Sequence, residues 1–247
     1  MTAIKFMTWN VENLYKPADD ASASKISKYQ NKLDLLAQTI LRLNPDVIAF
    51  QEVGGDDSLK DLQRELAGGY PGMAISGMPD RRGIRVAFLS KMPIDEEEEV
   101  VDFPPGPALD INRVSSSGDI VPVDRMGRGA LRIRVTKNGH TFDTITAHLK
   151  SKLLTYPRPG SSSFTPRDEE ERAQTAGIAL MRRSAEAVTL RIYINNLIEG
   201  NNTTPLLLMG DFNDVPDAQT SLILCGPDGS EINTRGFNRR DRGDDTR

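Results

Sequence analysis

The sequence predicts an α/β fold in which a strand, helix, strand unit occurs twice. Short apolar runs typical of buried strands occur at residues 46–50 and 205–213, and stretches with helical periodicity precede them at 25–43 and 167–199. Polar residues follow the strands in both units. Because open α/β sheets place ligand sites at the carboxyl ends of their strands, we expect the functional residues there.

The length indicates one globular domain spanning residues 1–247, and the composition is typical of soluble globular proteins. The chain is 38% hydrophobic and 27% charged, and no apolar stretch approaches the roughly 20 residues of a membrane span. The N-terminal MTAIKFMTWN lacks the apolar segment and cleavage site of a signal peptide, so cytoplasmic location is the default expectation. A net charge of −4 argues against a strongly basic nucleic-acid module but allows a phosphate substrate.

The first unit begins with an alternating strand at residues 4–9. A helix follows over 25–43 and ends at Asn44 and Pro45, and strand 46–50 then delivers Gln51 and Glu52 at its end. The helical spacing is carried by Leu33, Leu36, Ala37, Ile40 and Leu43.

Antiparallel strands are expected between the two units. Residues 83–94 and 129–149 have strand periodicity, and Asn138-Gly139 is the dipeptide preferred in a tight type I′ hairpin. The acidic run 95–99 resembles a metal site, but consecutive charges on a strand point in different directions, so we interpret it as a solvated edge.

The second unit consists of a strand at 140–149 that ends in His148, the helix at 167–199 and the strand at 205–213. Stretches 103–128 and 155–166 are rich in Pro, Gly and Ser and are expected to be loops. The single cysteine, Cys225, excludes an internal disulfide and a cysteine zinc site, and we expect it to be a buried small residue.

The polar clusters supply residue types suited to holding a hard divalent cation against a phosphate: Asn10, Glu52, His148, Asp211 and Asn213. A magnesium-like ion takes oxygen ligands and needs only one or two protein carboxylates. Hydrolysis of a phosphate ester has three further requirements: a group that activates water, donors that stabilise the charge on the phosphoryl oxygens, and a group that assists the leaving oxygen. A lone His or Asn is more often structural. Asp211 belongs to the cluster GDFND, which directly follows the apolar run LLLM, where a carboxylate is costly without a partner or ion.

Four motifs in order resemble those of the endonuclease/exonuclease/phosphatase superfamily, the deoxyribonuclease I-like proteins. They are TWNVENL, QEV, AHLKS and GDFND, and the resemblance extends from Ile4 to about Pro216. It implies a two-layered α/β sandwich of mixed sheets flanked by helices. It also implies a hydrolase of phosphoric esters that uses Mg²⁺, with Mn²⁺ as an alternative.

The resemblance implies a role for each matching residue. Glu52 would be a metal ligand, and Asn10 would support the metal and the phosphate. Arg128, in GRGALRIRV, resembles an arginine that contacts the substrate phosphate.

The catalytic roles fall on the two later motifs. His148 would donate to the scissile phosphate or the leaving oxygen, Asp211 would orient and activate the attacking water, and Asn213 would hold that water or stabilise the transition state.

The chain departs from the family pattern near its end. Members of the family that the chain resembles finish with two more strands, which carry an Asp and then a Ser-Asp-His motif. Here the two histidines are His140 and His148, and NRRDRGDDTR follows Phe237. The sequence therefore predicts a fold that is incomplete at the C-terminus, with 235–247 as loop or disordered. A truncated chain, an impaired homologue, and a variant that takes its last histidine from a partner remain open.

Two classes of function remain open. The first is a metal-dependent phosphodiesterase, an endonuclease or exonuclease acting on DNA or RNA, with a phosphatase of a small phosphorylated metabolite or lipid headgroup as its alternative. The second is a non-catalytic scaffold that binds phosphate ligands. Five arginines could form a basic lip for nucleic acid or be ordinary solvated residues: Arg81, Arg82, Arg85, Arg125 and Arg128.

Overall fold

The computed structural model describes residues 3–105, 109, 111–115, 117–200 and 203–226, which form two compact units. Of the described residues, the first unit comprises those up to Val101 together with 127–148 and 203–211, and the second comprises those within 102–126 and 149–200 together with 212–226. The predicted loop at 235–247 lies outside the described residues.

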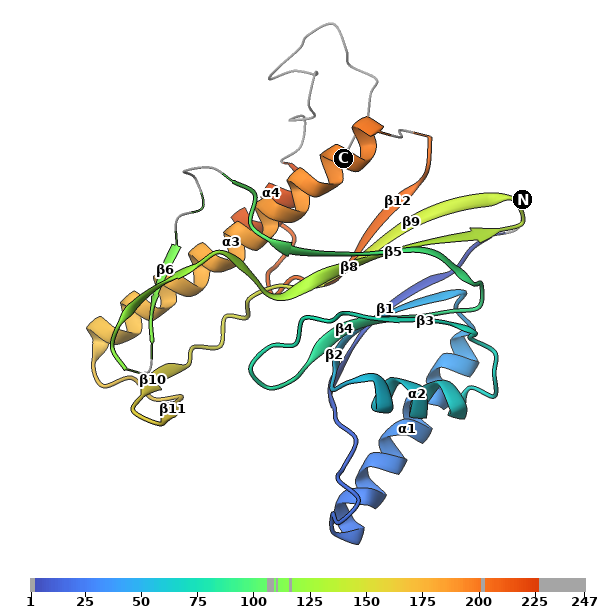
Figure 1. The fold of residues 1–247 in the computed structure, drawn as a ribbon, viewed down its shortest axis with the longest axis horizontal. Helices are drawn as coiled ribbons and strands as arrows, with labels where there is room; N and C mark the ends of the chain where they lie inside the picture. Colours follow the sequence, from blue (N-terminus) through green and yellow to red (C-terminus); the bar gives the residue numbers. More distant parts are fainter. Residues whose placement is uncertain (1–2, 106–108, 110, 116, 201–202, 227–247) are drawn as a thin grey trace, which may run out of the picture. The chain divides into compact units, whose positions relative to one another are not determined.

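The first unit contains a four-stranded sheet in the order β1-β2-β4-β3, with two helices beside it (Figure 1). β1 and β2 run parallel and α1 connects them, while β4 is antiparallel to both β2 and β3. The bounds are β1 Phe6–Leu14, α1 Ala23–Leu43, β2 Val47–Val53, α2 Asp56–Glu65, β3 Gly72–Ile75 and β4 Arg85–Ser90. The first predicted strand, helix, strand unit is therefore confirmed.

A second four-stranded sheet of the same unit has the order β12-β9-β8-β5. β12 runs parallel to β9, and β8 is antiparallel to β9. The bounds are β5 Ile94–Asp102, β8 Arg125–Lys137, β9 His140–His148 and β12 Leu206–Asp211. Asn138 and Gly139, with φ of 51° and 79°, form the β8–β9 turn, as predicted for a type I′ hairpin.

The two sheets pack face to face and share a hydrophobic core. Alternate residues of β2, Val47 and Ala49, pack with Phe88 of β4 against Leu131 and Ile133 of β8, and all five are fully buried. Because strand side chains alternate in direction, the other residues of β2 face away from this core, toward the helices. β2 is thus buried on both faces, as its continuous apolar run predicts.

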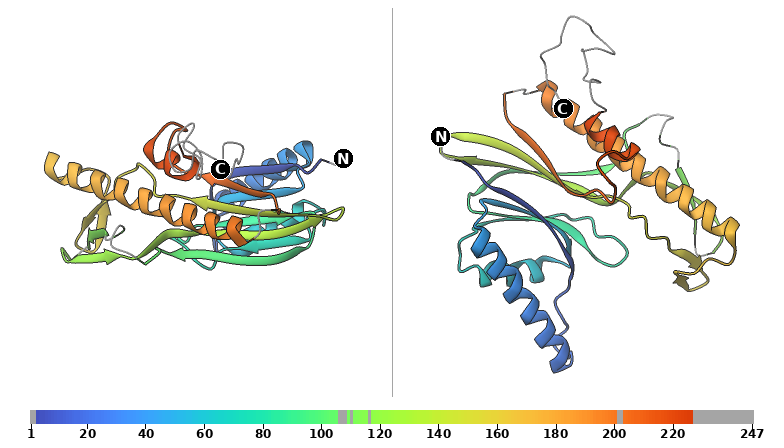
Figure 2. Two further views of the ribbon diagram at one scale, coloured as in Figure 1. Left: turned by 90° about the horizontal axis from the view of Figure 1, so that it is seen from above. Right: turned by 180° about the vertical axis from the view of Figure 1, so that it is seen from behind.

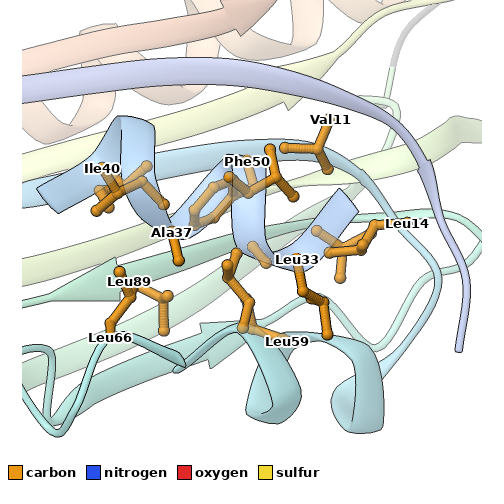
Figure 3. Packing of buried hydrophobic residues seen from close by; sticks show 14 of the residues in the cluster. Val11, Leu14, Leu33, Ala37, Ile40, Phe50, Leu59, Leu66 and Leu89 are labelled. Atoms are coloured by element: carbon orange, nitrogen blue, oxygen red, sulfur yellow. The ribbon is translucent and has the colours of Figure 1, made fainter. Parts of the chain in front are cut away.

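The outer face of the first sheet is covered by α1 and α2. Ile48 and Phe50 of β2 pack against Ala37 and Ile40 of α1 and Leu59 of α2 (Figure 3). The further views show both helices on the same side of this sheet (Figure 2). The predicted arrangement of helix-flanked mixed sheets is confirmed for this unit.

Gln51 is a polar link between the two sheets. Its side chain is 1% exposed, and its Nε2 donates to Thr8 Oγ1 at 3.2 Å within the first sheet and to Thr146 Oγ1 at 3.0 Å in the second. A buried amide requires such partners, and these bonds connect β2 to β9 of the other sheet, one residue before Glu52. Gln51 is therefore a structural residue that supports the neighbouring site residues.

The second unit contains two helices and two small hairpins. Its bounds are β6 Ile111–Val114, β7 Ile120–Val123, β10 Tyr156–Arg158, β11 Ser161–Ser163, α3 Glu169–Gly200 and α4 Gln219–Cys225. The hairpins correct the prediction that 103–128 and 155–166 are loops. Ile111 and Val123 bury apolar side chains against Ala185 of α3, a long-range contact that composition does not reveal.

Cys225 also differs from its prediction, because it is exposed at the end of α4. The long predicted helix is confirmed as α3, with bounds shifted by one or two residues. In the described part of the chain, no helix combines the length and apolar character needed to cross a membrane.

Candidate active site

Four of the predicted site residues lie together in the first unit. Asn10 and Glu52 come from the parallel strands β1 and β2, and His148 and Asp211 end the parallel strands β9 and β12. β1 lies against β12, and β2 lies against β9. The carboxyl ends of the two parallel pairs therefore meet at one edge of the sandwich, as expected from the position of each residue at the end of its strand.

The Asn10 side chain joins the two carboxylates of this site. Its Nδ2 donates to Asp211 Oδ2 at 2.9 Å and approaches Glu52 Oε1 at 3.4 Å, while its Oδ1 accepts the Glu12 backbone N–H at 2.9 Å. The bond from Glu12 fixes the orientation of the amide, because the oxygen end must face that donor. Asn10 thus holds Glu52 and Asp211 close to each other from opposite sheets.

Backbone irregularities direct these side chains. The pairing of β1 with β2 shifts register between Asn10 and Leu14, and Glu52 has a φ of 67°, a left-handed conformation that is uncommon for residues other than glycine. Gly210 has a φ of 153°, and a Cβ there would lie 2.0 Å from the Ala147 carbonyl oxygen. Only glycine permits this approach, which places Asp211 directly opposite His148.

His148 is buried and neutral. Its side chain is 3% exposed, Nε2 lies 3.5 Å from Asp211 Oδ2, and Nδ1 has no hydrogen-bond partner among the described residues. Burial, helped by the Arg128 charge, lowers the pKa of His148 to about 3, although Asp211 acts in the opposite direction. The distance would permit an ion pair, but burial outweighs the carboxylate, so the imidazole is a neutral hydrogen-bonding group at physiological pH.

The lowered pKa of His148 predicts a loss of stability in acid. The unfolded chain takes up a proton near the ordinary histidine pKa of 6.5, whereas the pKa of His148 in the folded chain is about 3. Stability is therefore full above about pH 6.5 and falls as pH decreases through this window. In this range the free energy of unfolding should change with pH by up to about 1.4 kcal/mol per pH unit, and we expect His148→Gln to remove this dependence. Urea unfolding across the range measures it.

His140 provides the matched control, since it is exposed and the chain has two histidines. His140→Gln should leave the acid slope of the unfolding free energy close to that of the wild type. Equal slopes in the wild type and His148→Gln would contradict the neutral assignment.

Arg128 lies beside His148 and is held from two sides. Its Nη1 donates to the His148 backbone carbonyl at 3.0 Å, and its Nε donates to Asp80 Oδ2 at 3.2 Å. Its side chain is 10% exposed. Asp80 was not predicted from sequence, where PDRRG indicates only a turn.

Asn213 belongs to the second unit. Its Nδ2 donates to the Leu149 carbonyl at 3.0 Å, and the neighbouring Asp214 accepts ion pairs from Lys152 at 2.7 Å and Arg183 at 3.2 Å. The Lys152 bond holds the pKa of Asp214 down to about 2. These bonds tie the segments after His148 and Asp211 together, and the catalytic role of Asn213 stays a prediction.

The donor set suits a hard cation. The described residues contain no group of three His, Cys, Asp or Glu side chains that could hold a metal, but Glu52 and Asp211 both reach one amide. Two carboxylates in this proximity repel each other, and Mg²⁺ characteristically takes one or two protein carboxylates and completes its shell with water and phosphate oxygens. The residues present therefore fit such an ion, with Glu52 as its principal ligand.

The chain is similar to known proteins in its sequence profile and in its fold. The sequence profile of the Endonuclease/Exonuclease/phosphatase family matches residues 7–246. No curated protein sequence matches the chain significantly.

Solved structures with a similar fold include three of different origin. A β-hairpin deletion mutant of Staphylococcus aureus β-toxin is 18% identical, with 91% of this chain and 74% of that chain covered and a TM-score of 0.52. The human nocturnin catalytic domain with bound sulfate is 18% identical (88% and 67% covered, TM-score 0.53). Caenorhabditis elegans TDP2 is 17% identical (86% and 48% covered, TM-score 0.52). At these identities the likeness shows the fold.

Proposed function

This chain belongs to the endonuclease/exonuclease/phosphatase family, a family of phosphoesterases, and on that premise we propose that it is a divalent-metal-dependent phosphodiesterase that hydrolyses DNA or RNA. We further propose that residues 1–247 act as one domain in the cytoplasm. The observation that carries the proposal is the amide of Asn10 between the carboxylates of Glu52 and Asp211. This amide brings together two carboxylates that come from different sheets.

Glu52 would hold Mg²⁺ or Mn²⁺, with Asn10 fixing the carboxylate in place. The bound ion would supply a positive charge that offsets the charge growing on the phosphoryl oxygens. Arg128 adds a second cationic group beside the site, and guanidinium groups match phosphate oxygens in geometry and charge.

Asp211 is the proposed general base. Its carboxylate accepts a proton from a water molecule whose oxygen attacks phosphorus. The bond from phosphorus to the leaving oxygen breaks, and the leaving oxygen takes up a proton from solvent water. Neutral His148, whose Nε2 faces Asp211, would donate a hydrogen bond to the phosphate or the leaving oxygen. Asn213, two residues after Asp211, is the proposed second holder of the water.

Removal of the metal tests this function. We expect the chain of residues 1–247 to cleave an end-labelled single-stranded oligonucleotide in Mg²⁺, and EDTA to reduce the rate at least about 10³-fold, with recovery on adding excess Mg²⁺ or Mn²⁺. The readout is the initial cleavage rate on a denaturing gel.

The other outcomes separate the alternatives. Cleavage that persists in EDTA would contradict metal dependence, and oligonucleotide binding without cleavage in any metal would favour the non-catalytic scaffold. Hydrolysis of a phosphomonoester in place of the oligonucleotide would favour the phosphatase of a small metabolite or lipid headgroup.

A further inference from the structure

Asp80, in the loop between β3 and β4, brings two arginines together. Its Oδ2 lies 3.4 Å from both Nε and Nη2 of Arg82, which belongs to the same loop, and 3.2 Å from Nε of Arg128, which comes from β8 of the other sheet. Two guanidinium groups thus converge on one carboxylate oxygen. Among these three side chains, two positive charges face one negative charge.

The backbone of this loop is fixed at several points. Asp80 Oδ1 accepts the N–H groups of Arg82 at 2.8 Å and Ile84 at 3.3 Å, and the Asp80 N–H donates to the Ile84 carbonyl at 3.0 Å. The Tyr15 hydroxyl donates to the Arg82 carbonyl at 2.8 Å. Arg82 is therefore well placed even though its side chain is 51% exposed.

The two arginines lie beside the candidate active site. Arg128 contacts the backbone of His148, and Arg82 Nη1 lies 3.5 Å from Asn13 Oδ1, near the end of β1. The pairing of β1 with β2 ends with Leu14 opposite Val53, the residue after Glu52. Arg82 thus lies near the strand ends that carry Asn13 and Glu52 and is half-exposed, while Arg128 is nearly buried.

We propose that Arg82, held by Asp80 beside Arg128, binds a second phosphate of the substrate, next to the phosphodiester that is cleaved. The inference rests on the proposed function and adds that the substrate strand is bound through two consecutive phosphates. Holding two guanidinium groups at one carboxylate costs repulsion that a bound anion relieves. An exposed arginine in a fixed position can bind such an anion through charge-assisted hydrogen bonds with little loss of freedom.

Arg81 allows a matched test, because it lies next to Arg82 in the same loop, carries the same charge and is also exposed. The probes are a short single-stranded oligonucleotide and bis(p-nitrophenyl) phosphate, which has one phosphodiester and no neighbouring phosphate. We expect Arg82→Gln to lower the ratio of kcat/KM for the oligonucleotide to kcat/KM for the single diester about tenfold, and Arg81→Gln to change it less than about twofold. The salt slope of oligonucleotide binding should fall by about 0.7 in Arg82→Gln.

Asp80→Asn tests the positioning role. It should lower the same ratio, and the double variant with Arg82→Gln should lower it little further, since Asp80 acts through the arginine. Equal effects of Arg81→Gln and Arg82→Gln would overturn the inference, because general electrostatic attraction would then suffice. A wild-type chain that hydrolyses neither probe would overturn the proposed function and, with it, this inference.

Discussion

Asp211→Asn is expected to lower kcat/KM for oligonucleotide cleavage by at least about 10³-fold with little change in folding. The substitution keeps the size of the side chain and can still accept the 2.9 Å hydrogen bond from Asn10, but it cannot take a proton from water at neutral pH. Single-turnover cleavage measured with saturating enzyme separates this chemical defect from weaker binding. Thermal unfolding of the same sample checks the fold.

Asp214 offers a control within the same motif. Its carboxylate is engaged by Lys152 and Arg183, so Asp214→Asn should lower the melting temperature because a nearly buried ion-paired group is lost. Cleavage by the folded fraction of Asp214→Asn should stay within a few-fold of wild type. An Asp211→Asn enzyme that cleaves at the wild-type rate would refute its role as general base.

Glu52→Gln is expected to raise the Mg²⁺ concentration needed for half-maximal activity by about 100-fold and to lower the maximal rate. The reason is that the amide retains the shape of the side chain but removes the full negative charge that a hard cation needs. Calorimetric titration with Mn²⁺ should show the same loss of affinity without requiring turnover.

Glu12→Gln is the matched control for this change. Glu12 is exposed, and its backbone N–H, not its side chain, orients Asn10. The variant should therefore change the half-saturating Mg²⁺ concentration less than about threefold. If Glu52→Gln bound Mn²⁺ as tightly as the wild type, Glu52 would not be the metal ligand.

Much of the fold was predictable because single segments carry the relevant signals. The run from Val47 to Phe50 is apolar on consecutive residues, which is the pattern of a strand buried on both faces, and Asn138-Gly139 encodes its own turn. The hairpins at 111–123 and 156–163 were missed because their sequences resemble loops. For the first of them, burial against Ala185, far along the chain, stabilises a structure that its local sequence does not specify.

Asp80, and the distinction of Arg82 from the other candidate arginines, could not be predicted from the sequence for a similar reason. Arg82 was one of five candidate arginines, and nothing in PDRRG distinguishes it from its neighbour Arg81. The distinction arises because Arg128, 48 residues from Asp80, reaches the same carboxylate oxygen. Such a contact depends on how two sheets pack and has no local signature.

The sequence by itself determined which residue types end each strand, and so it identified Asn10, Glu52, His148 and Asp211 as candidates. It could do this because a strand fixes the direction and the end point of its own chain. The tertiary structure decided that these four residues meet, that Asn10 bridges both carboxylates, and that burial makes His148 neutral. Distances, desolvation and charge coupling arise between segments far apart in the chain, so only the packed sheets of the first unit could set them.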